Sequence, residues 1–400
     1  MSNIYDELME RNLVKQTVFG EELREKLGKE KMVCYIGFDP TARSLHVGSL
    51  VAILYLVRMQ RAGHTPIALV GGATGSIGDP SFRNDMRPMM SEETRQENVE
   101  RIKAQIASFF DPNAENKLIV VNNEDWIKKV SWLEMLNVVG ANMSVNRMLS
   151  HECFKNRMEK GLSFLEFNYM PMQAYDFWHL NKEYGCDLEL GGDDQWANIL
   201  AGVELIRRKE NKPVFAMTLP LLTKADGTKM GKTAGGAVWL DREMYSDYDF
   251  YQYFRDVEDE KVRELFLYLT FLSVQEIDEI CNVKGKAINE AKERLAFEIT
   301  KIVRGEESAK LAQAQSRAAF GAGNTEDMPT IEIEKASATN IIEVLIATGE
   351  AKSRGDAKRL IDGGAIKIDD EAITTYDKEI TKTEFVLRRG KKSVIKVVVK

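Results

Sequence analysis

The segment from Tyr35 to Ser49 (YIGFDPTARSLHVGS) carries a histidine where an apolar run gives way to a helical pattern. The free N–H groups and the dipole of a helix N-terminus favour a phosphate group. A histidine there can donate a hydrogen bond to a phosphate oxygen, and Gly48 allows a nucleotide to approach the backbone closely. An ordinary strand–turn–helix explains an isolated HxG equally well, so the nucleotide interpretation depends on the whole string.

A glycine-rich segment, residues 68–87 (ALVGGATGSIGDPSFRNDMR), follows a second apolar run. Its small residues leave room for a ligand at the edge of a sheet. Asp79 could hold an ammonium group there, while Arg83 and Arg87 could meet phosphates. Taken alone, a flexible loop with solvated charges is the better interpretation of this segment.

Residues 167–180 (FNYMPMQAYDFWHL) predict a helix with one polar face. Tyr169, Gln173 and Asp176 are four and three residues apart, so they share that face. Three polar side chains among Phe, Met and Trp form a polar slot in an apolar wall, which suits an aromatic amino acid with a phenol. An amphipathic helix with a solvated face is the alternative.

Two later segments combine glycines with polar or basic residues. In residues 190–199 (LGGDDQWANI), Asp194 and Gln195 lie at a strand-to-helix junction, where they could bind ribose hydroxyls or cap the helix. In residues 221–233 (LLTKADGTKMGKT), a loop carries lysines that can close over phosphates, namely Lys224, Lys229 and Lys232. The spacing of a Walker loop is absent, and a solvated basic loop is the alternative.

The elements around these residues predict the fold. Buried strands are expected at residues 32–38, 66–72 and 117–123, with helices at residues 47–63 and 91–110. This alternation predicts a Rossmann-like α/β domain whose parallel sheet binds ligands at the carboxyl ends of its strands. An α-helical domain and a small α+β domain are expected to follow. The expected boundaries are residues 1–220 for the first domain, 221–245 for a mobile loop, 246–325 for the helical domain, 326–335 for a linker and 336–400 for the last domain.

Composition is typical of a soluble globular protein. Of the 400 residues 44% are hydrophobic and 29% are charged, and no apolar run approaches the length that crosses a bilayer. The N-terminus lacks the apolar stretch of a secretory signal, and the four scattered cysteines have no metal-binding spacing. We therefore expect a cytoplasmic protein with no structural metal and no membrane partner. The net charge of −7 argues against a coat of nucleic acid but allows a local basic surface.

Taken together, these segments resemble a class I aminoacyl-tRNA synthetase, and within that class the bacterial tyrosyl-tRNA synthetases. His46-Val47-Gly48-Ser49 is similar to the HIGH signature, and Lys229-Met230-Gly231-Lys232-Thr233 is similar to the KMSKS signature. The resemblance covers essentially the whole chain. Two signatures in the right order and at about the right separation are far more specific than either one alone.

The resemblance implies activation of L-tyrosine by ATP with Mg²⁺, followed by transfer to tRNA(Tyr). It implies that Tyr35 and Asp176 bind the phenol of tyrosine. It assigns to the ammonium group Asp79, Tyr169 and Gln173, with Asn123 nearby. The resemblance implies that the residues on the ATP side of the site are Gly37, Asp39, Thr41, His46, Gly48, Gly192, Asp194 and Gln195. It assigns to the departing pyrophosphate Arg83, Arg87, Lys229, Lys232 and Thr233.

The resemblance also implies macromolecular partners. Family members are homodimers through the first domain, near Phe164, and the helical region resembles their anticodon-arm domain. Residues 351–369 (AKSRGDAKRLIDGGAIKID) resemble a small RNA-binding fold shared with a ribosomal small-subunit protein. Basic residues recur there at helical spacing and can follow a phosphate backbone, namely Lys352, Arg354, Lys358 and Arg359.

Two positions depart from the family pattern. Ser49 replaces the second histidine of the first signature. We expect Ser49 to act in catalysis, with a weaker or shorter contact to a phosphate or ribose. Glu189 stands where many relatives have glutamine, which changes the polarity of the substrate pocket. We expect neither departure to affect Tyr35, Tyr169, Gln173 or Asp176.

The same residues allow three alternative functions. A tryptophanyl-tRNA synthetase shares the fold and both signatures, but Tyr35, Asp176 and the basic tail favour tyrosine. A small-molecule nucleotidyltransferase would not need KMGKT, a helical domain and a basic tail together. A non-catalytic RNA-binding protein derived from a synthetase is favoured only by Ser49. Tyrosine-dependent exchange of pyrophosphate into ATP separates all of these.

Overall fold

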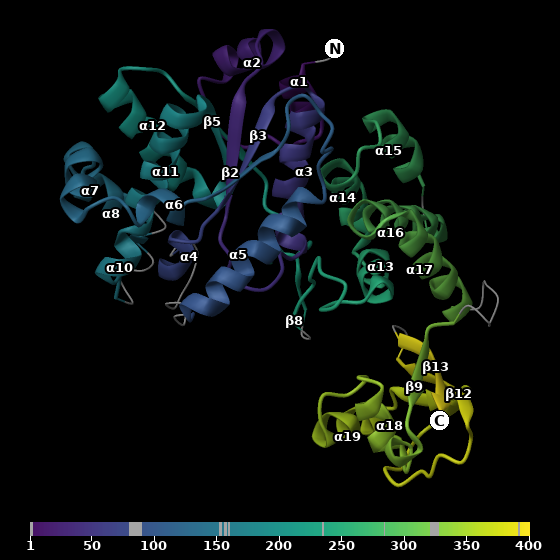
Figure 1. Cartoon of the computed structure of the whole chain (residues 1–400). Helices are drawn as coiled ribbons and strands as arrows, with labels where there is room; N and C mark the ends of the chain where they lie inside the picture. Colours follow the sequence, from purple (N-terminus) through teal and green to yellow (C-terminus); the bar gives the residue numbers. More distant parts are fainter. Residues whose placement is uncertain are drawn as a thin grey trace. The chain divides into compact units, whose positions relative to one another are not determined.

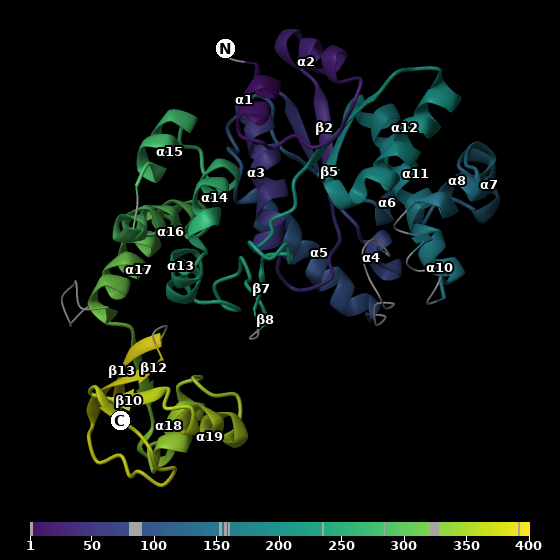
Figure 2. The same cartoon turned by 180° about the vertical axis from the view of Figure 1, so that it is seen from behind.

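The computed structural model describes residues 3–79, 90–151, 154–155, 158, 161–233, 236–283, 285–320, 328–390 and 393–400, and Figures 1 and 2 show it from opposite sides. The chain forms two compact units. The first holds residues 1–245 and 257–291, and the second holds residues 246–256 and 292–400. The five segments expected from the sequence stay a prediction, because compactness alone does not separate a loop or a linker from its neighbours.

A six-stranded sheet forms the centre of the first unit, in the order β1–β6–β5–β2–β3–β4. Neighbouring strands pair in parallel, except that β1 runs antiparallel to β6 at one edge. The expected α/β fold with a parallel sheet is confirmed, and its central strands are apolar because helices cover both faces. The strands are β1 (Thr17–Val18), β2 (Val33–Phe38), β3 (Thr65–Val70), β4 (Ile119–Asn122), β5 (Cys186–Gly192) and β6 (Phe215–Leu219).

Helices pack on the two faces of this sheet (Figures 1 and 2). On one face, α3 (Val47–Arg61) and α5 (Glu92–Ala107) contact the strands from β2 to β4. On the other face, α11 (Tyr169–Tyr184) and α12 (Trp196–Glu210) contact β5 and β6. The other described helices of this unit are α1 (Ile4–Glu10), α2 (Gly20–Lys29), α4 (Thr74–Ile77), α6 (Glu124–Ile127), α7 (Trp132–Val138), α8 (Val145–Ser150), α10 (Phe164–Phe167), α14 (Val262–Leu269) and α15 (Val274–Cys281).

The order of the strands reverses beside β2. From β2 the chain adds β3 and β4 on one side, whereas β5 lies on the other side of β2 and β6 lies beyond it. In an open parallel sheet, ligands bind in the crevice at the carboxyl ends of the strands where this order reverses. The ends of β2 and β5 are therefore the place where functional side chains are expected to converge.

The second unit contains helices and a separate five-stranded sheet in the order β11–β10–β12–β13–β9. α13 (Asp247–Arg255) packs against α17 (Glu306–Ala319), and most of α16 (Ile288–Arg304) belongs to this unit. α18 (Ile341–Ala347) and α19 (Arg354–Asp362) share an apolar core with the sheet. The strands are β9 (Thr330–Ile333), β10 (Ile366–Ile368), β11 (Glu371–Ala372), β12 (Glu384–Arg389) and β13 (Ser393–Val399).

One strand of this sheet lies in a stretch that the sequence did not indicate. β9 falls within the expected linker, ahead of the helix pair, and pairs in parallel with β13 near the end of the chain. The last domain, expected from residue 336, therefore includes a strand that lies ahead of that boundary. Within the described residues, no helix combines the length and the apolar character that crossing a membrane requires.

Candidate active site

Tyr35 and Glu189 occupy paired positions on the neighbouring parallel strands β2 and β5. Their side chains therefore project from the same face of the sheet. The hydroxyl of Tyr35 donates a hydrogen bond to Oε1 of Glu189 at 2.6 Å, and Nε2 of Gln173 on α11 donates to the same oxygen at 3.1 Å. Tyr35 is 2% exposed and Glu189 is 1% exposed. Polar groups from three elements thus meet in a dry interior.

Asp176 lies one turn further along α11 and accepts a second set of hydrogen bonds. Its Oδ2 accepts from Nδ2 of Asn123 at 2.9 Å, and its Oδ1 accepts from Nε1 of Trp126 at 2.7 Å. Asn123 follows β4 directly and Trp126 belongs to α6, so these contacts join α11 to the end of the sheet. Both oxygens of the Asp176 carboxyl are held in a fixed orientation.

Burial raises the pKa of both carboxyl groups. The pKa of Asp176 rises to about 7, although the hydrogen bonds from Asn123 and Trp126 favour its ionised form. The pKa of Glu189 rises to about 8, through burial and then through the nearby charge of Asp176, against the lowering effect of the hydrogen bonds from Tyr35 and Gln173. The site therefore contains two carboxyl groups that titrate near neutral pH.

A further chain of hydrogen bonds runs along the ends of β2 and β3. The hydroxyl of Tyr169 donates to Oδ2 of Asp39 at 3.0 Å, and Oγ1 of Thr74 donates to Oδ1 of Asp39 at 2.8 Å. Nδ2 of Asn123 donates to Oγ1 of Thr74 at 3.1 Å. Because Asn123 also contacts Asp176, residues assigned to tyrosine and residues assigned to ATP belong to one connected network.

His46 caps α3 at the position expected from the sequence. Its Nδ1 accepts a hydrogen bond from the backbone N–H of Gly48 at 2.9 Å, so the neutral ring carries its hydrogen on Nε2 and can donate from there. A Cβ atom at position 48 would lie 2.6 Å from Cε1 of His46, so a larger residue there would displace the imidazole from this cap. Trp239 forms a β-bridge with His46, which brings the chain after the KMGKT segment to the start of α3.

The residues expected beside the ribose contact other predicted site residues. Nζ of Lys229, in the KMGKT segment, lies 2.8 Å from Oδ2 of Asp194. Nε2 of Gln195 donates to Oδ2 of Asp79 at 2.6 Å. Asp194 and Gln195 belong to the short 3-10 helix Asp193–Gln195 that follows β5, so the loop and the end of β5 meet at this point.

The remaining predicted residues lie along the same edge of the sheet. Gly37 is exposed near the end of β2, Thr41 is exposed ahead of α3, Ser49 is half-buried in the first turn of α3, and Gly192 ends β5. Lys232 and Thr233 form β7, which pairs with β8 (Gly236–Ala237). Their side chains, together with Arg83 and Arg87, lie outside the described residues. The roles assigned to all of these residues stay a prediction.

Sequence reasoning did not select two residues of these networks, Thr74 and Trp126, and it named Glu189 only as a departure from the family pattern. The expectation that Glu189 leaves Tyr35 and Gln173 unaffected is wrong, because its carboxyl accepts a hydrogen bond from both. The signal was an acidic residue between two leucines in a buried parallel strand, since a carboxyl there needs polar partners. Thr74 and Trp126 carried no comparable signal.

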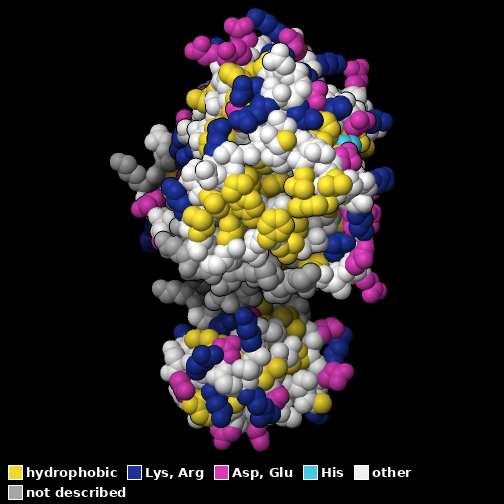
Figure 3. Space-filling model, turned by 90° about the vertical axis from the view of Figure 1, so that its left-hand side faces the viewer, with side chains coloured by type: hydrophobic (Ala, Val, Ile, Leu, Met, Phe, Trp, Pro, Cys, Tyr) yellow, Lys and Arg dark blue, Asp and Glu magenta, His cyan; other side chains and the backbone are white. Residues whose placement is uncertain are grey.

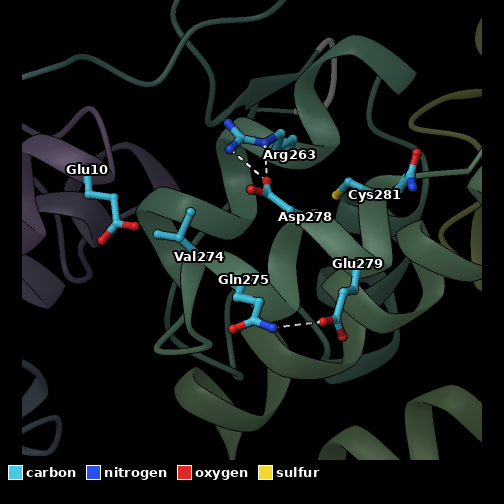
Figure 4. Close-up of a pocket in the computed structure, with 8 residues that line it drawn as sticks. Glu10, Arg263, Val274, Gln275, Asp278, Glu279 and Cys281 are labelled. Carbon is cyan, nitrogen blue, oxygen red and sulfur yellow. Dashed lines mark hydrogen bonds and ion pairs between the residues drawn. The ribbon is translucent and has the colours of Figure 1, made fainter.

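A hollow of about 650 Å³ lies elsewhere in the first unit, between the end of α1 and α15 (Figure 4). Arg263 lines this hollow, and its guanidinium group lies 2.7 Å from Oδ1 of Asp278. Nε2 of Gln275 donates to Oε1 of Glu279 at 3.3 Å. The hollow shares no residue with the networks described above. The candidate active site is therefore the edge of the sheet and not this hollow.

Comparisons with known proteins agree on one family. The family model "tRNA synthetases class I (W and Y)" matches residues 26–321, and the model "Tyrosine–tRNA ligase SYY-like C-terminal domain" matches residues 321–397. The tyrosine–tRNA ligase of Clostridium kluyveri is 49% identical over 407 residues, and that of Clostridium botulinum is 50% identical over 408 residues, with 100% of both chains covered in each case.

A solved structure agrees with these matches. The C-terminally truncated mitochondrial tyrosyl-tRNA synthetase of Aspergillus nidulans is 29% identical, with a TM-score of 0.72 over 79% of this chain and 94% of that chain. The family models together span both units, and the relatives match from end to end. The chain therefore belongs to the tyrosyl-tRNA synthetase family of class I aminoacyl-tRNA synthetases, and it ligates tyrosine to tRNA at the expense of ATP, with release of AMP and diphosphate.

Proposed function

We propose that tyrosine binds with its phenol between Tyr35 and Asp176. Asp176 carries this proposal, because its buried carboxyl is an acceptor held in place by Asn123 and Trp126. A phenol hydroxyl that enters a dry pocket needs such an acceptor, since an unpaired buried polar group costs about 1–3 kcal/mol. The ammonium group of tyrosine then lies toward Asp79, Tyr169 and Gln173, with Asn123 nearby.

ATP binds over the ends of β2 and β5, with its phosphates at the N-terminus of α3. His46 donates from Nε2 to a phosphate oxygen, and Asp194 and Gln195 lie beside the ribose. The backbone at Gly37, Asp39, Thr41, Gly48 and Gly192 lines the nucleotide, and Ser49 adds a hydroxyl. Arg83, Arg87, Lys229, Lys232 and Thr233 meet the pyrophosphate.

Mg²⁺ accompanies ATP on its phosphate oxygens. Within the described part of the chain, no three His, Cys, Asp or Glu side chains are grouped so that they could hold a metal ion. Mg²⁺ commonly keeps several waters and binds substrate phosphates with few protein ligands. When bound together with ATP, such an ion would supply positive charge at the phosphates.

In the first step, the carboxylate of tyrosine attacks the α-phosphate of ATP and pyrophosphate leaves. The carboxylate is already ionised at neutral pH, so the step needs no general base. The protein contributes positioning and charge stabilisation, through His46 and the loop lysines. In the second step, the terminal ribose hydroxyl of tRNA attacks the carbonyl carbon of the mixed anhydride and AMP leaves.

Exchange of labelled pyrophosphate into ATP tests the tyrosine pocket. We expect exchange that depends on L-tyrosine and is not supported by tryptophan. The matched variant is Asp176→Asn, which keeps the side-chain size but presents an N–H group where the phenol needs an acceptor. Exchange with tryptophan alone, or full activity of Asp176→Asn, would contradict the placement of the phenol.

The residues from 336 to 400 bind tRNA(Tyr) through basic side chains on and beside α19. They carry 13 basic and 10 acidic residues, a net charge of +3 in a chain whose total is −7. Arg354 and Arg359 are 72% and 79% exposed on their side chains, although Arg354 pairs with Glu343 and Arg359 with Asp356. Lys352 and Lys358 complete the set. The end-to-end match to bacterial tyrosine–tRNA ligases supports a cytoplasmic location.

The enzyme forms a homodimer through an apolar patch on α7, α8 and α10. Figure 3 shows hydrophobic side chains gathered on this face of the first unit. Leu133 is 71% exposed, Phe164 is 69% exposed, and the ring of Phe164 meets that of Trp132 at 6.1 Å. An apolar patch of this kind on a soluble protein marks an interaction surface.

The molar mass in solution, measured by light scattering after size-exclusion chromatography, tests whether this patch is the dimer interface. The wild-type chain is expected at twice its monomer mass of 45.3 kDa. Leu133→Asp and Phe164→Asp are expected near the monomer mass, whereas Leu311→Asp, at a leucine 57% exposed in the second unit, should leave the mass unchanged. A dimer that survives both substitutions in the patch would place the interface elsewhere.

A further inference from the structure

Glu189 has no role in the mechanism above, although its carboxyl is buried beside the tyrosine pocket. Oε1 accepts from both Tyr35 and Gln173, while Oε2 has no hydrogen-bonding partner among the described residues. A Cβ atom at position 202 would lie 3.1 Å from Oε2 and 3.0 Å from Cδ1 of Phe177. Gly202 on α12 and Phe177 on α11 therefore enclose this second oxygen.

Among the residues that the structure describes, no cation lies against Glu189 to balance a negative charge. The sheet presents Tyr35 from β2 and Ala216 from β6, and α12 presents Gly202. On β5 itself, Cys186 is buried, and Asp187 is already paired with Lys212 at 2.6 Å. The facing groups on α11 are Gln173, which is neutral, and Asp176, which is acidic.

A buried carboxylate without a cation is costly, and such a group keeps its proton instead. A neutral acid also suits the contacts, because a hydroxyl at Oε1 can donate its hydrogen to Tyr35 and accept from Gln173 through its lone pairs. Asp176 differs, since an N–H donor reaches each of its oxygens. Of the two carboxyl groups, Glu189 is therefore the one that holds a proton while Asp176 is ionised.

We propose that Glu189 is a positioning residue for substrate tyrosine. As a neutral acid, Glu189 turns the hydroxyl of Tyr35 toward the substrate phenol, so ionisation of Glu189 weakens tyrosine binding. This inference rests on the proposed placement of the phenol between Tyr35 and Asp176. The hydrogen bonds then run in one direction. The acid of Glu189 donates to Tyr35, Tyr35 donates to the phenol oxygen, and the phenol donates to the carboxylate of Asp176.

The 2.6 Å contact between Tyr35 and Glu189 supports either direction, because hydroxyl hydrogens rotate and a carboxylic acid has a hydrogen to give. Once ionised, Glu189 can only accept, so it holds the hydrogen of Tyr35 and the phenol oxygen loses its donor. The new negative charge also disfavours the ionised form of Asp176, which accepts from the phenol. Both effects weaken tyrosine binding as the pH rises, and the pKa of Glu189 near 8 places the change in an accessible range.

The experiment compares the KM for tyrosine in pyrophosphate exchange by the full-length wild-type enzyme and by Glu189→Gln, from pH 6.5 to pH 9. Glutamine can donate and accept at the same place but does not titrate. Relative to its own value at pH 6.5, the wild-type KM is expected to rise about tenfold by pH 9 beyond any rise seen in the variant. Titration of the substrate's ammonium group affects both proteins equally and cancels in this ratio.

Further variants separate positioning from a merely structural role. Glu189→Ala, which removes donor and acceptor together, is expected to raise the KM for tyrosine at every pH and to leave no excess pH dependence. A merely structural role would leave the pH profiles of the KM for tyrosine parallel in the wild type and Glu189→Gln, whatever the difference in their melting temperatures. Parallel profiles for the wild type and Glu189→Gln overturn the inference.

Tyr35→Phe distinguishes failure of this inference from failure of the proposed pocket. If Tyr35→Phe raises the KM for tyrosine at pH 6.5 while the other two profiles run parallel, the phenol placement stands and only the role of Glu189 is lost. If Tyr35→Phe binds tyrosine normally, the phenol lies elsewhere and both proposals fail.

Discussion

Replacing Glu189 with glutamine is expected to stabilise the first unit at alkaline pH relative to the wild type. Burial, and then the charge of Asp176, raises the pKa of Glu189 from the ordinary 4.5 to about 8. Between these two values the unfolded chain has lost this proton while the folded protein keeps it. The folded protein therefore binds more protons, and its stability falls as the pH rises through that window. Each pKa unit corresponds to about 1.4 kcal/mol, so the loss reaches on the order of 4 kcal/mol by pH 9.

Thermal unfolding followed by circular dichroism from pH 5.5 to pH 9 measures this effect. In a domain of this size, 1 kcal/mol shifts the melting temperature by about 2–4 °C. The difference in melting temperature between Glu189→Gln and the wild type should therefore move by roughly 10 °C in favour of the variant across this range. Glu183→Gln, at an exposed carboxyl on the same helix as Asp176, is the matched control and should follow the wild type.

A constant difference in melting temperature between the wild type and Glu189→Gln from pH 5.5 to pH 9 would contradict a protonated Glu189 in the folded protein. A constant difference means that Glu189 is already ionised in the folded protein at pH 5.5. Burial without a facing cation would then be insufficient to keep its proton. A difference that moved in favour of the wild type would mean that ionised Glu189 gains a stabilising partner.

Three further predictions concern the other parts of the site and the second unit. Asp176→Ala is expected to remain folded but to lose tyrosine activation, because the substrate phenol loses its acceptor. The N–H groups of Asn123 and Trp126 also lose their acceptor, at about 1–3 kcal/mol each, which lowers the melting temperature; normal exchange by the folded variant would place the pocket elsewhere. Lys229→Ala and Lys232→Ala should lower the single-turnover rate of adenylate formation more than tyrosine affinity, because loop lysines meet the phosphates as charge develops; unchanged rates with weaker tyrosine binding would speak against this. A chain that ends after Phe320, ahead of β9 and its partner β13, should keep pyrophosphate exchange and lose salt-sensitive tRNA binding and charging, whereas equal charging by both forms would show that the removed residues do not bind tRNA.

Local signals in the sequence determined much of the fold and part of the site. Continuous apolar runs alternating with helical patterns predicted the parallel sheet, because a strand buried on both faces has no polar side to show. The three-and-four spacing of Tyr169, Gln173 and Asp176 predicted one polar face, because side chains at that spacing lie together on a helix. The start of a helix near His46 was predictable for the same reason, since a cap depends on a few consecutive residues.

Which of these residues meet depends on contacts between distant parts of the chain. Tyr169 reaches Asp39 across 130 positions of the chain, and Tyr35 reaches Glu189 across 154 positions. Likewise, β9 finds its partner only in β13, near the end of the chain. Local periodicity carries no information about such pairs, because strand order and register arise when the whole sheet closes and buries its polar groups together. The residue types along each element were enough to predict the chemistry that it could offer. The packing of β2, β5 and α11 buries two carboxyl groups in one pocket, and the different hydrogen-bond donors around them give the two groups different protonation states.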